Sequence, residues 1–150
     1  MRTVLFAALM LCAAAAAAQK PEVFADRGGA IRGFDPVAYF TESRAVKGSE
    51  QFIHQWNGAT WRFASAENRD RFAAAPDKFA PQYGGYCAYG VAQNYAVSID
   101  PQAWSIVEGK LYLNYSRSVR GTWSKDIPGY IRKADANWPA VAPAAKAPGR

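Results

Sequence analysis

The chain has 150 residues, of which 50% are hydrophobic and 14% aromatic, and its formal net charge is +6 at pH 7. This length and apolar share indicate a single domain that is held together by its own core. Its basic residues are scattered and form no block interleaved with aromatic residues, which argues against a nucleic-acid partner and leaves solubility or contact with anionic envelope surfaces.

Residues 1–18 have the pattern of a secretory signal peptide. Arg2 precedes an apolar run over 4–10, and the small residues at 16–18 suit the cleavage site of a signal peptidase. The run is too short to span a bilayer. We therefore expect an exported chain that begins near Gln19, lies in the periplasm or outside the cell, and keeps no transmembrane span.

The first half of the mature chain predicts a lead-in, a short helix, a hairpin and a second helix. Residues 19–32 are predicted to form an extended, loosely ordered lead-in, and the compact domain is expected over 33–139. Asp35-Pro36 is a typical N-cap and first turn for a short helix over 37–41. Alternating residues on both sides of Asn57-Gly58 predict a β-hairpin, in which His54 shares the face of Phe52 and Trp56. Ser65 is expected to cap a helix over 66–75 that Pro76 ends.

The second half predicts another hairpin and further helices. The glycine-rich segment 79–91 fits a glycine-hinged stretch with one helical turn. Residues 104–107 and 111–115 are predicted to be strands, with Leu111 and Leu113 on one face and Tyr112 on the other. A helical region over 122–131, bent or restarted at Pro128, and a short helix over 131–137 follow. The Ala/Pro-rich tail 140–150 is expected to be disordered. The predicted fold class is therefore α+β, a small single domain with two short β-hairpins packed against several short helices.

Over residues 33–139 the chain resembles the YHS domain family, in its exported, longer bacterial form. The features that carry the resemblance are Asp35-Pro36-Val37, the Asn57-Gly58 hairpin, Phe63-Ala64-Ser65, Phe72, Pro76 and Tyr83-Gly84-Gly85-Tyr86-Cys87-Ala88. The resemblance implies a shared scaffold.

Shorter YHS modules, found in copper-transporting pumps and other metal-handling proteins, carry three cysteines that suit a soft or borderline metal ion. At the matching positions this chain has Ala38, Ala64 and Asn68. The resemblance therefore implies that a metal site of the short-module type is absent. Copper or zinc remains a candidate only through other residues.

Cys87 and His54 are the weak metal candidates. Cleavage removes Cys12, so Cys87 is the only thiol of the mature chain and no internal disulfide can form. Cys87 reads either as a buried small hydrophobe or as a ligand, redox group or nucleophile. His54 reads either as a hydrogen-bonded strand residue or as a metal partner of Cys87.

The segment around Cys87 is also a candidate ligand site. Tyrosine couples an apolar ring to a hydroxyl that can orient a ligand, and glycine permits close backbone approach. The residues considered for such a site are Asp35, Tyr39, Tyr83, Gly84, Gly85, Tyr86 and Cys87. The alternative is that the tyrosines, like the five tryptophans, are core residues.

No nucleophile elbow, phosphate loop or other catalytic motif is present in the sequence. The leading hypothesis is therefore an exported, non-catalytic YHS-like module that binds a small ligand, a metal ion or a protein partner. Two alternatives stay open. One is a thiol-dependent redox protein or enzyme that uses Cys87, and the other is a structural protein of the cell envelope.

Overall fold

Residues 22–144 are described by the computed structural model, so the expected signal peptide and the end of the tail lie outside the described residues. The fold is a small α+β domain, as the sequence predicted. Its three antiparallel sheets have two strands each: β1 (Ala25–Asp26) with β2 (Gly29–Ala30), β3 (Ser49–Trp56) with β4 (Ala59–Phe63), and β5 (Asp100–Val107) with β6 (Lys110–Asn114). The α-helices are α1 (Ala38–Thr41), α2 (Ala66–Ala74), α3 (Pro76–Phe79), α4 (Ala88–Ala92), α5 (Arg117–Trp123) and α6 (Ile127–Ala144).

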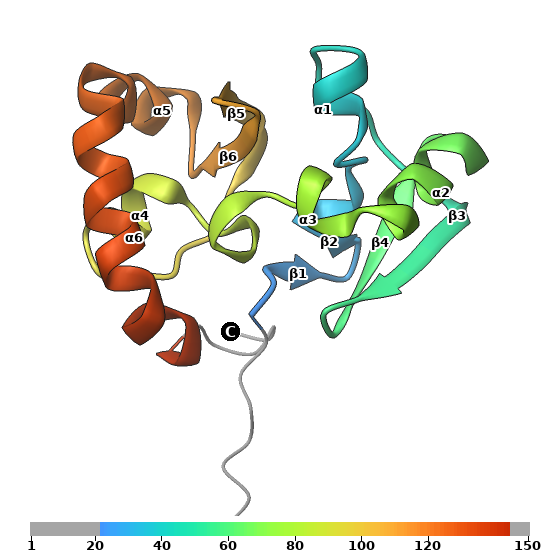
Figure 1. Cartoon of the computed structure of the whole chain (residues 1–150), viewed down its shortest axis with the longest axis horizontal. Helices are drawn as coiled ribbons and strands as arrows, with labels where there is room; N and C mark the ends of the chain where they lie inside the picture. The colour runs from blue at the N-terminus through green and yellow to red at the C-terminus, as the bar shows by residue number, and fades with distance from the viewer. Residues whose placement is uncertain (1–21, 145–150) are drawn as a thin grey trace, which may run out of the picture.

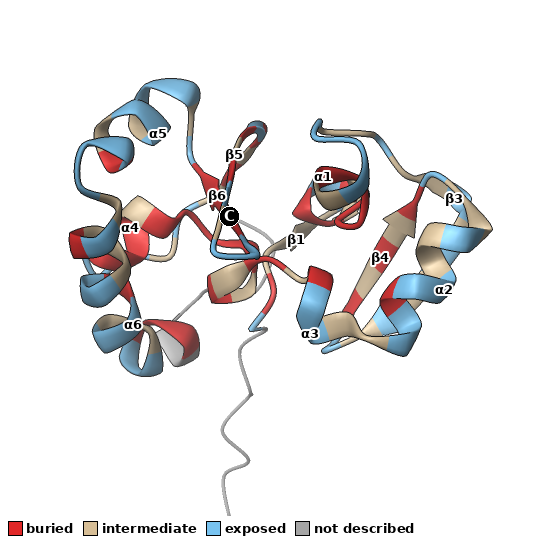
Figure 2. Ribbon diagram, turned by 45° about the horizontal axis from the view of Figure 1, so that its top comes forward, coloured by how far each residue is buried: buried red, intermediate tan, exposed pale blue. Residues whose placement is uncertain are grey.

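The elements form two halves, with β1 to β4 and α1 to α3 in one and β5, β6 and α4 to α6 in the other (Figure 1). The buried side chains form two clusters: the first fills the first half and also includes Cys87, Ile99, Leu111 and Leu113, and the second lies in the other half. Strand β6 is buried on both faces (Figure 2): Leu111 and Leu113 belong to the first cluster and Tyr112 to the second. The predicted alternation of these residues is therefore confirmed, and β6 is the element that both clusters share.

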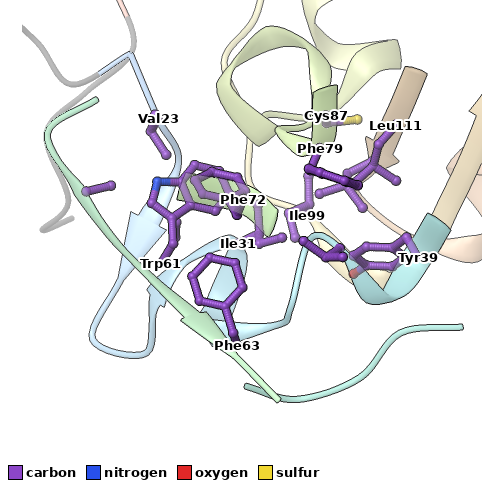
Figure 3. Close-up of a cluster of buried hydrophobic side chains, with 14 residues drawn as sticks. Val23, Ile31, Tyr39, Trp61, Phe63, Phe72, Phe79, Cys87, Ile99 and Leu111 are labelled. Carbon is purple, nitrogen blue, oxygen red and sulfur yellow. The ribbon is translucent and has the colours of Figure 1, made fainter. Parts of the chain in front are cut away.

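The first hairpin and the helix after it follow the sequence pattern closely. Asn57 and Gly58 have φ values of 49° and 74°, the left-handed pair that a tight two-residue hairpin turn requires. The Ser65 hydroxyl caps α2 by accepting a hydrogen bond from the Asn68 N–H at 3.1 Å. Phe72 on α2 then packs on β4, with its ring centroid 5.0 Å from that of Trp61 (Figure 3).

The lead-in is more ordered than the sequence predicted. Within 22–32, β1 and β2 form a small hairpin, and the side chains of Val23, Ala30 and Ile31 are buried in the first cluster. The Phe24 N–H donates to the Gly84 carbonyl at 2.8 Å. Long-range burial of three apolar residues thus fixes a segment whose local sequence has no strong pattern.

The helices around the prolines agree with the prediction at Pro76 and Pro128 but not at Pro139. Helix α2 ends before Pro76, which begins α3, and α6 starts at Ile127, so that Pro128 lies in its first turn, where the missing N–H costs nothing. Helix α6 passes through Pro139 and continues to Ala144, beyond the predicted end at 137 and into the tail expected to be disordered. Burial of Val141 and Ala142 offsets the cost of the interior proline. Among residues 22–144, no helix combines the length and apolar character needed to cross a membrane.

Candidate functional site

Asp35 is fully buried and forms the most densely hydrogen-bonded side-chain centre that the structure describes. Its Oδ1 accepts from the N–H groups of Val37 at 2.8 Å and Ala38 at 3.3 Å. Its Oδ2 accepts from the Ala64 N–H at 2.9 Å and from the Asn68 Nδ2 at 2.8 Å. One carboxylate therefore binds the turn that leads into α1 and ties it to the junction of β4 and α2, although the N-cap of α1 is Val37 and not Asp35 as predicted.

This centre joins the three residues for which the resemblance stated above predicts the loss of metal-binding cysteines. Ala38, Ala64 and Asn68 all donate to the same Asp35 carboxylate, although 33 residues separate Asp35 from Asn68. N–H donors surround the carboxylate and occupy both its oxygens, and none of the three residues offers a thiolate. These residues do not fit a soft metal ion.

Cys87 is buried at the N-terminus of α4 and makes three hydrogen bonds. Its Sγ accepts from the N–H groups of Gly90 at 3.3 Å and Tyr115 at 3.2 Å, and the thiol donates to Asn114 Oδ1 at 3.5 Å. Burial raises the pKa of the Cys87 thiol, although backbone N–H groups of Gly90, Tyr115 and Tyr89 oppose that rise. Its burial and its capping role fit a structural group better than an activated nucleophile.

The two weak metal candidates lie in different surroundings. His54 is half-buried on β3, on the predicted face with Phe52 and Trp56, and its ring packs against Phe72 at a centroid distance of 6.1 Å. It is not among the hydrogen-bond partners of Cys87. Across the described residues, no group of three His, Cys, Asp or Glu side chains is placed to hold a metal ion.

The tyrosines considered for a ligand site fall into two groups. Tyr39 is fully buried in the first cluster, and its hydroxyl donates to the Pro101 carbonyl at 2.9 Å. Tyr83 and Tyr86 belong to the second cluster and both pack against Trp138, at centroid distances of 5.9 and 6.2 Å. The structure therefore brings Tyr83 and Tyr86 together but places Tyr39 apart from them.

Two glycines of the candidate segment pack against the chain itself. Gly84 has a φ of 60°, and a Cβ there would lie 1.6 Å from the Glu22 carbonyl oxygen. Gly85 has a φ of 83°, and its Cβ would lie 2.7 Å from Ile31 Cγ2. The close approach to these glycines that was expected of a ligand is thus made by Glu22 and Ile31 of the same chain.

A pocket of about 130 Å³ lies beside this contact. Its lining comes from four separate stretches of the chain and draws on both halves: Glu22, Val23, Trp56, Asn57, Trp61, Ala80, Pro81, Gly84 and Trp138. We call it the indole pocket, because three of the five tryptophans line it. Of these three tryptophans, Trp61 is fully buried, whereas Trp56 and Trp138 are half-buried.

Comparisons with protein-family models, curated proteins and solved structures found no match. The site must therefore be interpreted from its own geometry.

Sequence reasoning assigned the tryptophans to the core, which is right for Trp61 and Trp123, but it did not foresee the indole pocket. Trp56 precedes the hairpin turn, which places it at the end of the β3–β4 hairpin. Trp138 is on the part of α6 that continues through Pro139. No local pattern links these positions, and of the residues predicted as a ligand site only Gly84 lines the pocket.

Proposed function

We propose that this protein is an exported, non-catalytic module that binds a small ligand in the indole pocket. The observation that carries the proposal is the convergence of Trp56, Trp61 and Trp138 on one concave site where the two halves meet. Small-molecule sites are concave and largely aromatic or apolar, with a few polar groups that orient the ligand. Here Glu22 and Asn57 supply those polar groups.

Two further observations support binding over the alternatives. Cys87 is buried and has a raised pKa, which disfavours the thiol-dependent enzyme or redox protein. The Asp35 centre retains the junction at which shorter YHS modules carry thiols, but its donors do not suit copper or zinc. A small organic ligand is therefore a better fit than a metal ion.

Native mass spectrometry of the mature protein tests the proposal. The wild type and a Trp138→Leu variant are each mixed with a set of low-mass metabolites and, separately, with copper(I), copper(II) and zinc. The expected result is a stoichiometric metabolite adduct on the wild type that is lost in Trp138→Leu. A matched Trp104→Leu variant, altered at a half-buried indole outside the pocket, should keep the adduct.

Two results would overturn the proposal. The first is the absence of any metabolite adduct on the folded wild type. The second is stoichiometric metal uptake that disappears in Cys87→Ser, which would assign metal handling to the thiol instead.

A further inference from the structure

We infer that the ligand of the indole pocket is a small organic cation of the alkylammonium class, such as a trimethylammonium group. This inference rests on the proposed function and adds the chemistry of the ligand. Aromatic faces attract cations because the π-system carries negative charge above and below the ring, and indole is the strongest of the protein side chains in this respect. Trp56 and Trp61 meet at a centroid distance of 5.9 Å and an interplanar angle of 57°. Because Trp61 is fully buried, the half-buried indoles of Trp56 and Trp138 are the rings that a rounded cation in the pocket can contact.

The local charge has the sign that a cation requires. Glu22 is the only charged residue among those that line the pocket in the described part of the chain, and its carboxylate is exposed. The whole sequence has 18 Lys and Arg against 12 Asp and Glu, yet no Lys or Arg contributes to the lining within 22–144. This acidic, indole-lined site on a basic protein therefore disfavours phosphates and carboxylates and favours a cation.

The size of the pocket limits the ligand to a small group. The pocket has a volume of about 130 Å³. Sites for larger ligands run from about 300 Å³ upwards. A trimethylammonium head, with one nitrogen and its methyl groups, matches this space.

A sugar is the main competing ligand, because sugars also bind against aromatic rings. A sugar needs one flat exposed ring and many hydrogen-bond partners. Here Trp61 is fully buried, the indole planes are tilted, and only Glu22 and Asn57 bring polar side chains to the lining. The pocket therefore favours a cation over a polyol.

Isothermal titration of the mature protein with three probes tests the inference. The probes are choline, its neutral isostere 3,3-dimethylbutan-1-ol, in which carbon replaces the charged nitrogen, and glucose. We expect choline to bind and the neutral isostere to bind at least about ten-fold more weakly, because it keeps the shape but loses the charge. Equal affinity for choline and its isostere, or tighter binding of glucose, would overturn the inference.

Pocket variants locate the choline site. Trp138→Leu should weaken choline binding by about 5- to 30-fold, the range expected for loss of one cation–π contact. Glu22→Gln should weaken it by about two- to five-fold, since the carboxylate is exposed. Trp104→Leu should leave it unchanged. Because Glu22 is at the surface, Glu22→Gln keeps the test valid if Trp138→Leu does not fold, and unchanged affinity in Glu22→Gln would contradict the inference.

The failure of this inference differs from failure of the proposed function. A pocket adduct in native mass spectrometry without choline binding would overturn the alkylammonium class and leave a small-ligand module. Absence of any metabolite adduct would overturn both.

Discussion

Asp35 shows at the residue scale how one buried carboxylate organises a junction between distant segments. Among the described residues it takes part in no salt bridge, and hydrogen bonds from three backbone N–H groups and one amide compensate for its burial. A buried charge is tolerated only when it is paired or fully hydrogen-bonded. This residue is therefore expected to stabilise the fold.

Replacing Asp35 with Asn tests this role. In the wild type both carboxylate oxygens accept hydrogen bonds from N–H groups. In the variant an NH₂ group replaces one of these oxygens, so at least one donor would lose its acceptor. We expect Asp35→Asn to lower the free energy of unfolding by about 2 to 4 kcal/mol in urea denaturation. Asn68→Ala, which removes one donor of four, should cost about 1 kcal/mol. A change below that control in Asp35→Asn would contradict this account of the junction.

Single-residue signals in the sequence predicted local geometry well. Asn57-Gly58 predicted a turn, Ser65 predicted a cap, and both are present because their causes lie within a few residues. The Asp35 contacts to Ala64 and Asn68 could not be predicted in this way. They depend on how α1 meets the β4–α2 junction, and no local pattern encodes that meeting.

At the scale of elements, the contact between Gly84 and Glu22 attaches the N-terminal segment to the rest of the domain. Gly84 belongs to a tight turn over Gln82–Gly85, in which Tyr83 and Gly84 both have positive φ values. Its carbonyl accepts from the Phe24 N–H, so backbone meets backbone without a side chain between them. The contact also shapes one wall of the indole pocket.

Alanine at Gly84 should disrupt this contact far more than alanine at Gly58. Both glycines have positive φ, so both variants incur strain of about 1 to 2 kcal/mol. Only at Gly84 would the new Cβ collide with backbone, whereas nothing lies within 4 Å at Gly58. Thermal unfolding should show a much larger loss of stability for Gly84→Ala. Equal losses in the two variants would show that the contact is dispensable.

Some features of the elements are determined by neighbouring residues and could be predicted, whereas others are determined by distant residues and could not. The alternation of Leu111, Tyr112 and Leu113 predicted which residues share a face, although not that both faces are buried. The end of α6 was predicted wrongly, because Pro139 suggests termination and the burial of Val141 and Ala142 overrides it. The predicted α+β class is nevertheless correct, because it depends on the presence of hairpins and helices and not on their exact ends.

At the scale of the whole molecule, buried phenols and a buried thiol predict that the protein loses stability at alkaline pH. These groups are neutral when protonated and become charged when they lose their protons. Burial raises the pKa of the phenols of Tyr39, Tyr83, Tyr86 and Tyr112 and of the Cys87 thiol. In the unfolded chain these groups lose their protons near about pH 8.5 for Cys and about pH 10 for Tyr. The unfolded state then binds fewer protons than the native state, so stability falls as pH rises.

The free energy of unfolding should therefore be fully retained below about pH 8.5 and should fall steeply above about pH 10. Urea titrations across this range measure it. Tyr86→Phe should show a shallower fall, because it removes one buried phenol whose pKa is raised by burial alone. A free energy of unfolding that does not change with alkaline pH would contradict the burial of these groups.

The indole pocket is likewise a property of the whole molecule. Its tryptophans come from β3, β4 and α6, and their meeting depends on how the two halves pack. Sequence reasoning identified aromatic residues and a glycine-rich segment, including Gly84, but could not place the pocket that Gly84 shares with Trp56 and Trp138. The resemblance to YHS domains concerned the scaffold and the three positions around Asp35, not this site.

The most direct test of the binding module is a two-dimensional ¹H–¹⁵N NMR spectrum, in which the five tryptophans give separate indole N–H signals. Adding the low-mass metabolite mixture should shift the signals of Trp56, Trp61 and Trp138. Those of Trp104 and Trp123, which lie outside the pocket, should stay in place. Shifts confined to Trp104 or Trp123, or no shift in any indole signal, would contradict ligand binding in the indole pocket.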